Sequence, residues 1–251
     1  MAVTPSSTLY FFGDVVAKLH RPGTIEQDLR WRLSACDHPS LLSPLVPDAA
    51  LCPDGLLLTL WPRVATADPD SPDQPWAEAG HLLGQLHSST LPDAAPASLA
   101  PSHGWLPRLA RAIDRAPLDL RVLGESLMYA ALGRPEPDTL IHGDWHLGQL
   151  GRTASGKWLL IDADDVGLGS PAWDLARPAG FRAAGLMDDA SFDLFLDAYR
   201  DAGGTAVPVE GDPWSQLDLP ARIAVYVAAS SGRADPETAR DLIDACRRMA
   251  P

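Results

Sequence analysis

The chain has 251 residues, of which 46% are hydrophobic and 21% charged, and its formal net charge is −13 at pH 7. This composition fits a soluble globular protein, and the acidic balance argues against a nucleic-acid-binding surface. The sequence has no signal-peptide pattern and no apolar run of about 18 residues, and its three cysteines lack metal-ligand spacing, so we expect a cytoplasmic protein without a membrane segment.

The first predicted structure is a β-hairpin. Residues 8–12 and 15–19 are short runs rich in β-branched and aromatic residues, and Gly13 and Asp14 form the turn between them. Lys18 falls within the second run, and the only other lysine among the 20 basic residues is Lys157. A lysine retained in so arginine-rich a chain indicates a role that a guanidinium cannot fill.

A helix follows the hairpin. Residues 24–27, Thr-Ile-Glu-Gln, match a capping box, which predicts that a helix starts there. Ile25, Leu29 and Leu33 recur every four residues, which predicts one apolar face, and the helix must end before Pro39.

The rest of the chain divides into a strand, a linker and helices. Residues 55–61 predict a buried strand, and the Pro- and Asp-rich residues 65–75 predict a linker, so we expect one domain over residues 1–64 and a second over 65–251. Residues 91–107 are Pro- and Ala-rich and predict a loop. Apolar periodicity and helix-start signals predict helices at 76–89, 106–116, 118–132, from 171, at 189–202, 220–229 and 235–249.

Residues 141–149, Ile-His-Gly-Asp-Trp-His-Leu-Gly-Gln, are the most informative stretch. Asp144 stands two residues after His142, Gln149 follows five residues later, and Asp162 follows Gln149 by thirteen. The turn-rich segment before Asp162 predicts a hairpin, which places Asp162 at a strand end facing the loop of Asp144 and Gln149. Phosphoryl transfer needs a carboxylate near the attacking hydroxyl and oxygen ligands for magnesium, and the alternative is a structural loop with paired or solvated acids.

This stretch, with residues 160–162 and 169–176, resembles the aminoglycoside phosphotransferase and choline kinase group of small-molecule kinases. Its Gly-Gln ending resembles the bacterial glucosamine-kinase and maltokinase branch, in which Gln replaces Asn. The resemblance implies an α+β, two-lobed, protein-kinase-like fold with a small, truncated, β-rich N-lobe and a mainly helical C-lobe. It also implies that ATP and Mg²⁺ bind in the cleft between the lobes.

The resemblance assigns roles to the acidic and amide residues. Asp144 would be the catalytic residue that orients the acceptor hydroxyl or takes its proton, while Gln149 and Asp162 would be the metal ligands. Asp174 would brace the catalytic loop. Asp164, two residues after Asp162, extends the acidic cluster and is expected to be solvated.

The resemblance also assigns the nucleotide site to the N-lobe. Lys18 would hold the phosphates and pair with Glu26 of the first helix. Residues 60–64, which include Leu60 and Trp61, would form the hinge that binds adenine through backbone groups. The family's phosphate-covering loop has no Gly-rich counterpart in the first sixty residues, so the lid must be short, at residues 4–8 or at the Gly13 turn.

The acceptor site is less defined by the sequence. Four residues near the motif are candidates for it, with core packing or solvation as the alternative for each: Trp145, Asp165, Trp173 and Arg177.

Two classes of function remain open. The first is a small-molecule O-kinase, a monomer or weak dimer, that phosphorylates a hydroxyl of an amino sugar, an aminoglycoside or a related sugar or natural product. The second is a catalytically silent kinase fold that binds a nucleotide or a partner. The complete set of site residues favours the first class, and the missing Gly-rich loop favours the second.

Overall fold

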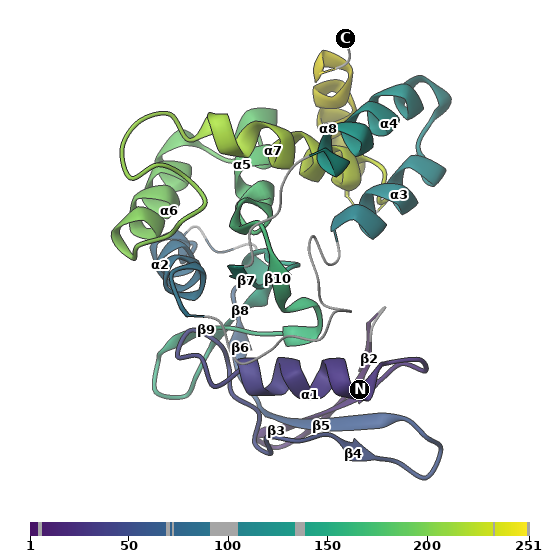
Figure 1. Cartoon of the computed structure of the whole chain (residues 1–251), viewed down its shortest axis with the longest axis vertical. Helices are drawn as coiled ribbons and strands as arrows, with labels where there is room; N and C mark the ends of the chain where they lie inside the picture. Colours follow the sequence, from purple (N-terminus) through teal and green to yellow (C-terminus); the bar gives the residue numbers. More distant parts are fainter. Residues whose placement is uncertain are drawn as a thin grey trace.

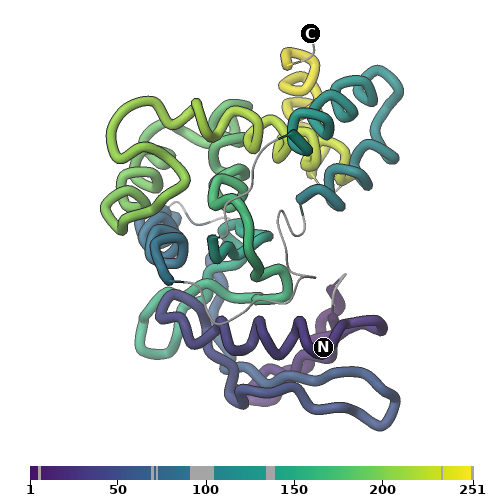
Figure 2. Tube along the Cα trace, in the orientation of Figure 1, coloured from purple at the N-terminus to yellow at the C-terminus, as the bar shows by residue number. Residues whose placement is uncertain are grey.

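The structure, a computed structural model, describes residues 1–4, 7–68, 71, 73–90, 105–133, 139–232 and 234–249. A small sheet with one helix occupies one end of the molecule, and most of the helices lie beyond it (Figure 1). The tube in Figure 2 shows that the N-terminal part of the chain lies at one end of the long axis and the C-terminal helix at the other. Within the described residues, no helix is both long and apolar enough to span a membrane.

The N-terminal sheet carries Lys18. Its antiparallel strands follow the order β1-β2-β3-β5-β4. The β2–β3 hairpin confirms the first prediction, and its turn uses Gly13 at φ +57°, a backbone conformation that glycine adopts at little cost. Lys18 lies opposite Leu9 and Thr59 in the centre of the sheet. The strands are β1 (Ala2–Val3), β2 (Ser7–Phe12), β3 (Val15–His20), β4 (Ala50–Leu51) and β5 (Leu57–Pro62).

Helix α1 (Glu26–Ala35) lies against this sheet (Figure 1). Leu29 and Leu33 are buried in a small core with side chains of the sheet region, as the periodicity predicts, but Ile25 is 57% exposed. The predicted capping box is wrong. The N-cap is Ile25, whose apolar side chain cannot accept a cap hydrogen bond, and the hydroxyl of Thr24 donates to the carbonyl of Arg21.

The connection between the sheet and the helical part is shorter than predicted. Strand β5 ends at Pro62, and β6 (Ala65–Thr66) already pairs with β8 (Leu150–Arg152), which pairs with β9 (Trp158–Leu160). This leaves Arg63 and Val64 between the two sheets, and we keep the domain boundary at residue 64 as a proposal.

Most of the predicted hinge, residues 60–64, lies within a strand. Leu60 and Trp61 lie within β5, opposite Ala17 and Val16 of β3, and the carbonyl of Leu60 accepts a hydrogen bond from the backbone of Leu45. Because backbone groups in a strand ladder are already paired, these two residues are not part of the free connection. Their binding to adenine stays a prediction without support from this geometry.

The helical part confirms most of the predicted helices. Helix α7 begins at Trp214, six residues before the predicted start, because Pro220 lies inside the helix rather than at its first turn. Residues 91–104 of the predicted loop lie outside the described residues, while Trp105 already belongs to a helix. The helices are α2 (Trp76–His87), α3 (Trp105–Arg115), α4 (Leu118–Leu132), α5 (Ala176–Ala184), α6 (Asp189–Asp201), α7 (Trp214–Ala229) and α8 (Pro236–Met249).

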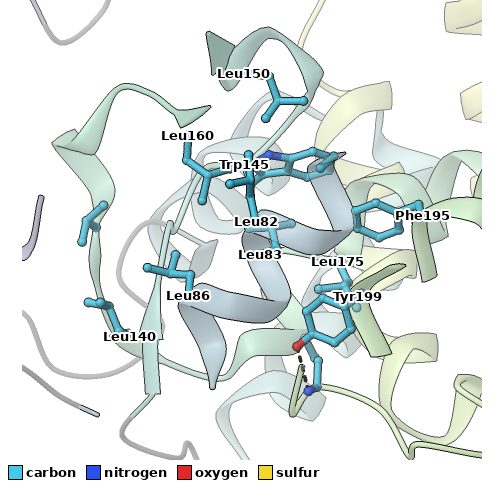
Figure 3. Close-up of a cluster of buried hydrophobic side chains, with 14 of the residues drawn as sticks. Leu82, Leu83, Leu86, Leu140, Trp145, Leu150, Leu160, Leu175, Phe195 and Tyr199 are labelled. Carbon is cyan, nitrogen blue, oxygen red and sulfur yellow. Dashed lines mark hydrogen bonds between the residues drawn. The ribbon is translucent and has the colours of Figure 1, made fainter. Parts of the chain in front are cut away.

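A buried apolar cluster packs around Trp145, in the segment of residues 141–149. Trp145 is 1% exposed and stacks on Phe195 of α6, with ring centroids 5.4 Å apart. Leucines of α2, β8 and β9 surround it, and Tyr199 closes the cluster on the far side (Figure 3). Because such a core is close-packed, the backbone around Trp145 is held in one position.

Candidate active site

The loop of residues 142–149, here called the catalytic loop, starts where β7 (Thr139–Ile141) ends. Gly143 has φ +82°, and a Cβ atom there would lie 2.1 Å from the carbonyl oxygen of Asp165. Only glycine fits such a position, since a side chain would meet both strain and a backbone clash. The ring Nε2 of His142 lies 2.8 Å from the carbonyl of Ile161, which ties this loop to the end of β9.

Asp174 braces the catalytic loop, as the resemblance implied. Its side chain is fully buried and accepts hydrogen bonds from the backbone N–H groups of His142 (2.6 Å) and Gly143 (2.9 Å). His87 Nε2 lies 3.0 Å from the same carboxylate, and His87 Nδ1 contacts the hydroxyl of Tyr199. Burial opposes ionisation of Asp174, but these hydrogen bonds outweigh it and hold its pKa below the ordinary carboxyl value.

Asp144 lies between two arginines. Its Oδ2 lies 3.1 Å from Arg108 Nη2 of α3, and its Oδ1 lies 3.4 Å from Arg177 Nη2 of α5. Arg108 also donates to the carbonyl of Gly143 (2.9 Å) and to Asp165 (2.8 Å). A guanidinium presents several donors in a fixed plane, so Arg108 can fix the catalytic carboxylate relative to the loop that follows β9.

Gln149 and Asp162 meet, as their spacing predicts. Gln149 Nε2 donates to Asp162 Oδ2 at 3.3 Å. Asp162 follows β9 and adopts φ +65°, the only positive φ among the described non-glycine residues. Such strain persists only where the surroundings impose it, and it occurs preferentially at functional sites.

The donor atoms of this pair fit a magnesium ion. Mg²⁺ prefers oxygen ligands, usually keeps several waters, and takes few ligands from protein, so one carboxylate and one amide oxygen suffice. Among the described residues, no group of three or more His, Cys, Asp or Glu side chains is placed to hold a metal ion.

Lys18 reaches the same place from the N-terminal sheet. Its Nζ lies 2.5 Å from Asp162 Oδ1 and 2.7 Å from Asp164 Oδ1, and the residue is only 6% exposed. Burial lowers the pKa of the ammonium, but the two carboxylates outweigh this and raise it. Burial likewise opposes ionisation of Asp162, and Lys18 reverses the effect, so the pKa of Asp162 is lowered.

The predicted ion pair between Lys18 and Glu26 does not form. Glu26 is exposed at the start of α1 and pairs with Arg30 at 2.8 Å. The acidic partners of Lys18 are Asp162 and Asp164, so the expectation of a solvated Asp164 is also wrong.

Of the two predicted lids, the Thr4 turn lies nearer the charged site. Ser7 N donates to Thr4 Oγ1 at 3.0 Å, and Ser7 lies opposite His20 of β3, whose Nδ1 is 3.8 Å from Asp164. The Gly13 turn is at the other end of the hairpin. Residues 5 and 6 of this lid lie outside the described residues.

A cavity of about 730 Å³ opens beside the catalytic loop. Arg177 lines it and also contacts Asp144, so one side chain connects the cavity lining with the carboxylate of the catalytic loop. Burial and the nearby Arg177 lower the pKa of His146 to about 3, so this lining residue is neutral at neutral pH. The lining also includes apolar and aromatic residues and two exposed acids, among them Trp76, Phe181, Leu186, Met187, Asp73 and Asp188.

The four candidate residues for the acceptor site differ in whether they line the cavity. Arg177 lines the cavity, and Trp145 borders it although most of its ring is in the core. Trp173 is 2% exposed and stacks on Trp105, with centroids 5.6 Å apart, so its assignment to the acceptor site is corrected to core packing. Asp165 does not line the cavity and pairs with Arg108, and burial raises the pKa of its carboxyl despite that arginine.

The sequence analysis did not predict the contacts of two residues in the site, Arg108 and Asp164. Arg108 sits on a helix with no motif around it, and its contacts lie 35 and 57 residues away along the chain. Asp164 stood out only as part of an acidic run, and nothing in its local pattern indicates a partner in the N-terminal sheet.

Solved structures share this fold. A choline/ethanolamine kinase family protein from Mesorhizobium loti is 15% identical, with 98% of this chain and 86% of that chain covered and a TM-score of 0.63. The choline kinase LicA from Streptococcus pneumoniae is 14% identical, with 99% and 92% covered and a TM-score of 0.64. The GDP and kanamycin complex of APH(2″)-IIIa is 12% identical, with 99% and 91% covered and a TM-score of 0.65.

These similarities establish the predicted kinase-like fold, with its small antiparallel sheet region and mostly helical remainder. No match was found among curated protein sequences. The model of the phosphotransferase enzyme family matches residues 6–217. Because that match covers most of the sequence, the chain belongs to the phosphotransferase enzyme family.

Proposed function

We propose that the protein is an ATP- and Mg²⁺-dependent O-kinase that phosphorylates a hydroxyl of a small molecule. The observation that carries this proposal is the convergence of Lys18, Asp162 and Gln149 next to the catalytic loop, while Asp144 of that loop pairs with Arg177, which lines the neighbouring cavity. Phosphate positioning, metal binding and hydroxyl activation need these groups side by side.

Each residue has a role that follows from its position. Asp144 orients the acceptor hydroxyl and accepts its proton as the oxygen attacks phosphorus, and Arg108 and Arg177 hold the carboxylate in place. Lys18 binds phosphate oxygens. Gln149 and Asp162 would hold Mg²⁺, which supplies charge neutralisation for the phosphates when it is bound.

The acceptor binds in the cavity beside Arg177. A volume of about 730 Å³ accommodates a sugar-sized or larger molecule. The apolar and aromatic lining suits the ring faces of a sugar or natural product, and the exposed Asp73 and Asp188 suit an amino group. These features support an amino sugar, an aminoglycoside or a related natural product as the acceptor, and a structural neighbour was solved with kanamycin.

The proposal is tested by incubating the protein with ATP, Mg²⁺ and a panel of sugars, amino sugars and aminoglycosides, with ADP release as the readout. We expect at least one acceptor to stimulate ADP release. Phe181→Ala, which removes a ring from the cavity wall, should raise KM for that acceptor while leaving KM for ATP unchanged. Equal KM for the acceptor in both proteins would place the acceptor elsewhere.

A further inference from the structure

The acidic partners of Lys18 both come from the loop after β9, residues 161–166, which we call the Asp162 loop. Lys18 Nζ lies 2.5 Å from Asp162 Oδ1 and 2.7 Å from Asp164 Oδ1. Asp164 is the more enclosed of the two, with 17% of its side chain exposed against 35% for Asp162. A buried ammonium needs at least one permanent counter-charge, because an unpaired charge in the interior is costly.

The two carboxylates differ in their other contacts. Asp162 also contacts Gln149, the second candidate metal ligand, whereas Asp164 faces His20 of β3 at 3.8 Å. Asp162 therefore belongs to the metal site of the proposed function. A carboxylate that neutralises a metal is a weaker partner for a lysine, which leaves Asp164 as the partner that Lys18 keeps.

The charged residue that helix α1 directs at this site is an arginine, Arg32, and not the expected glutamate, Glu26. Glu26 is exposed and forms an ion pair with Arg30, while Arg32 is 9% exposed and faces the Asp162 loop. Arg32 Nε donates to the carbonyl of Val166 at 3.1 Å. Burial lowers the pKa of Arg32, and the nearby Asp165 and Asp164 counteract this.

We propose that Asp164 is the positioning residue of Lys18, in the role that a glutamate of the first helix was expected to fill, and that Arg32 fixes the Asp162 loop from α1. The inference rests on the proposed kinase function, because a positioned ammonium matters for catalysis only where phosphates bind. Its structural part, the pairing of Lys18 with Asp164, can be tested without nucleotide or metal.

The first experiment is a double-mutant cycle on urea unfolding of the free protein, with Asp164→Asn, Lys18→Met and the double variant. Asp164→Asn should lower the unfolding midpoint of the wild type, because Lys18 loses a partner. In the Lys18→Met background the same change should raise the midpoint, because Asp162 and Asp164 then face each other without a cation. Equal effects in both backgrounds would overturn the pairing.

The second experiment measures kinetics with any acceptor that the panel identifies. Asp164→Asn should lower kcat/KM for ATP about tenfold or more relative to the wild type. Added to Lys18→Met, the same change should lower kcat/KM by less than about twofold relative to Lys18→Met alone. Asp197→Asn, the same chemical change on the exposed face of α6, serves as the control and should leave kcat/KM unchanged. A loss on Glu26→Gln in place of Asp164→Asn would overturn the assignment.

A magnesium titration separates the positioning role from metal binding. Oδ2 of Asp164 is buried and has no hydrogen-bond partner among the described residues, so a second metal ligand is the alternative. We expect the loss in Asp164→Asn to persist at saturating Mg²⁺, and recovery at high Mg²⁺ would overturn the proposal. If no acceptor is phosphorylated by the wild type, the kinase function fails, while the unfolding cycle still decides whether the pair exists.

Discussion

At the scale of single residues, the buried position of Lys18 explains why a lysine stands in so arginine-rich a chain. Its ammonium fits between two carboxylate oxygens at 2.5 and 2.7 Å. A planar guanidinium is wider and needs more donors satisfied, so arginine does not fit in the same space. The strand pattern located this lysine correctly, but its partners lie more than a hundred residues away and could not be read from local periodicity.

Substitution of Lys18 tests this explanation. Lys18→Met should raise KM for ATP and lower kcat together, because a phosphate-positioning charge acts in both the ground state and the transition state. Lys18→Arg should show the same two losses. Lys157→Arg is the matched control, since this exposed lysine of the β8–β9 hairpin donates to the carbonyl of Pro39 and not to a residue of the site. Wild-type turnover in Lys18→Arg would contradict the assignment.

Arg108 makes a second residue-scale prediction. Arg108→Lys keeps the charge but cannot contact Gly143, Asp144 and Asp165 at once, so the catalytic carboxylate loses its fixed orientation. We expect kcat to fall about tenfold while KM for ATP changes little. Arg111→Lys, on the exposed side of the same helix, should leave both constants unchanged. Loss of kcat in both variants would indicate a general effect on α3.

At the scale of elements, the catalytic loop depends on a residue of the segment that leads into α5. Asp174 joins this segment to the catalytic loop and, through His87, to α2. Asp174→Asn should lower the free energy of unfolding by about 2 kcal/mol near neutral pH, because a buried charged acceptor loses its hydrogen bonds. Asp201→Asn, on an exposed turn of α6, is the control and should have almost no effect.

The pH dependence of that effect has a definite sign. The folded protein holds the pKa of Asp174 below its ordinary value of 3.8, so the carboxylate contributes stability above that value. The contribution is lost as the pH falls through the lower, folded pKa. Urea unfolding of wild type and Asp174→Asn should therefore show a difference near neutral pH that shrinks below about pH 4. A constant difference across that range would count against an ionised, braced Asp174.

Most elements could be predicted from the sequence because their signals are local. The hairpin around Gly13, the helix of residues 76–89 and the meeting of Gln149 with Asp162 follow from periodicity, turn residues and spacing. Tertiary contacts decided the rest. Trp145 and Trp173 flank the motif alike, yet both pack in cores, and only the folded chain shows that Trp145 also reaches the cavity.

At the scale of the whole molecule, the N-terminal sheet and the helical part meet at the candidate metal site. Lys18 comes from the sheet, and Asp162 and Gln149 come from the helical part. Asp162→Ala should weaken Mg²⁺-dependent ATP binding more than Gln149→Ala, because a charged oxygen holds Mg²⁺ more strongly than an amide. Calorimetric titration of ATP with Mg²⁺ and with EDTA measures both. Equal losses would contradict the ranking, and wild-type binding independent of the metal would contradict the magnesium site.

Transfer of the γ-phosphoryl group at Asp144 is tested most directly by product analysis with labelled ATP and the acceptor found in the panel, in wild type and Asp144→Asn. The wild type should give a phosphorylated acceptor. Asp144→Asn should give it about 10²- to 10⁴-fold more slowly, while its affinity for ADP and Mg²⁺ stays close to that of the wild type. A phosphorylated acceptor formed at the wild-type rate by Asp144→Asn would contradict this account of the site, and a wild type that binds ATP but phosphorylates no acceptor would favour a silent kinase fold.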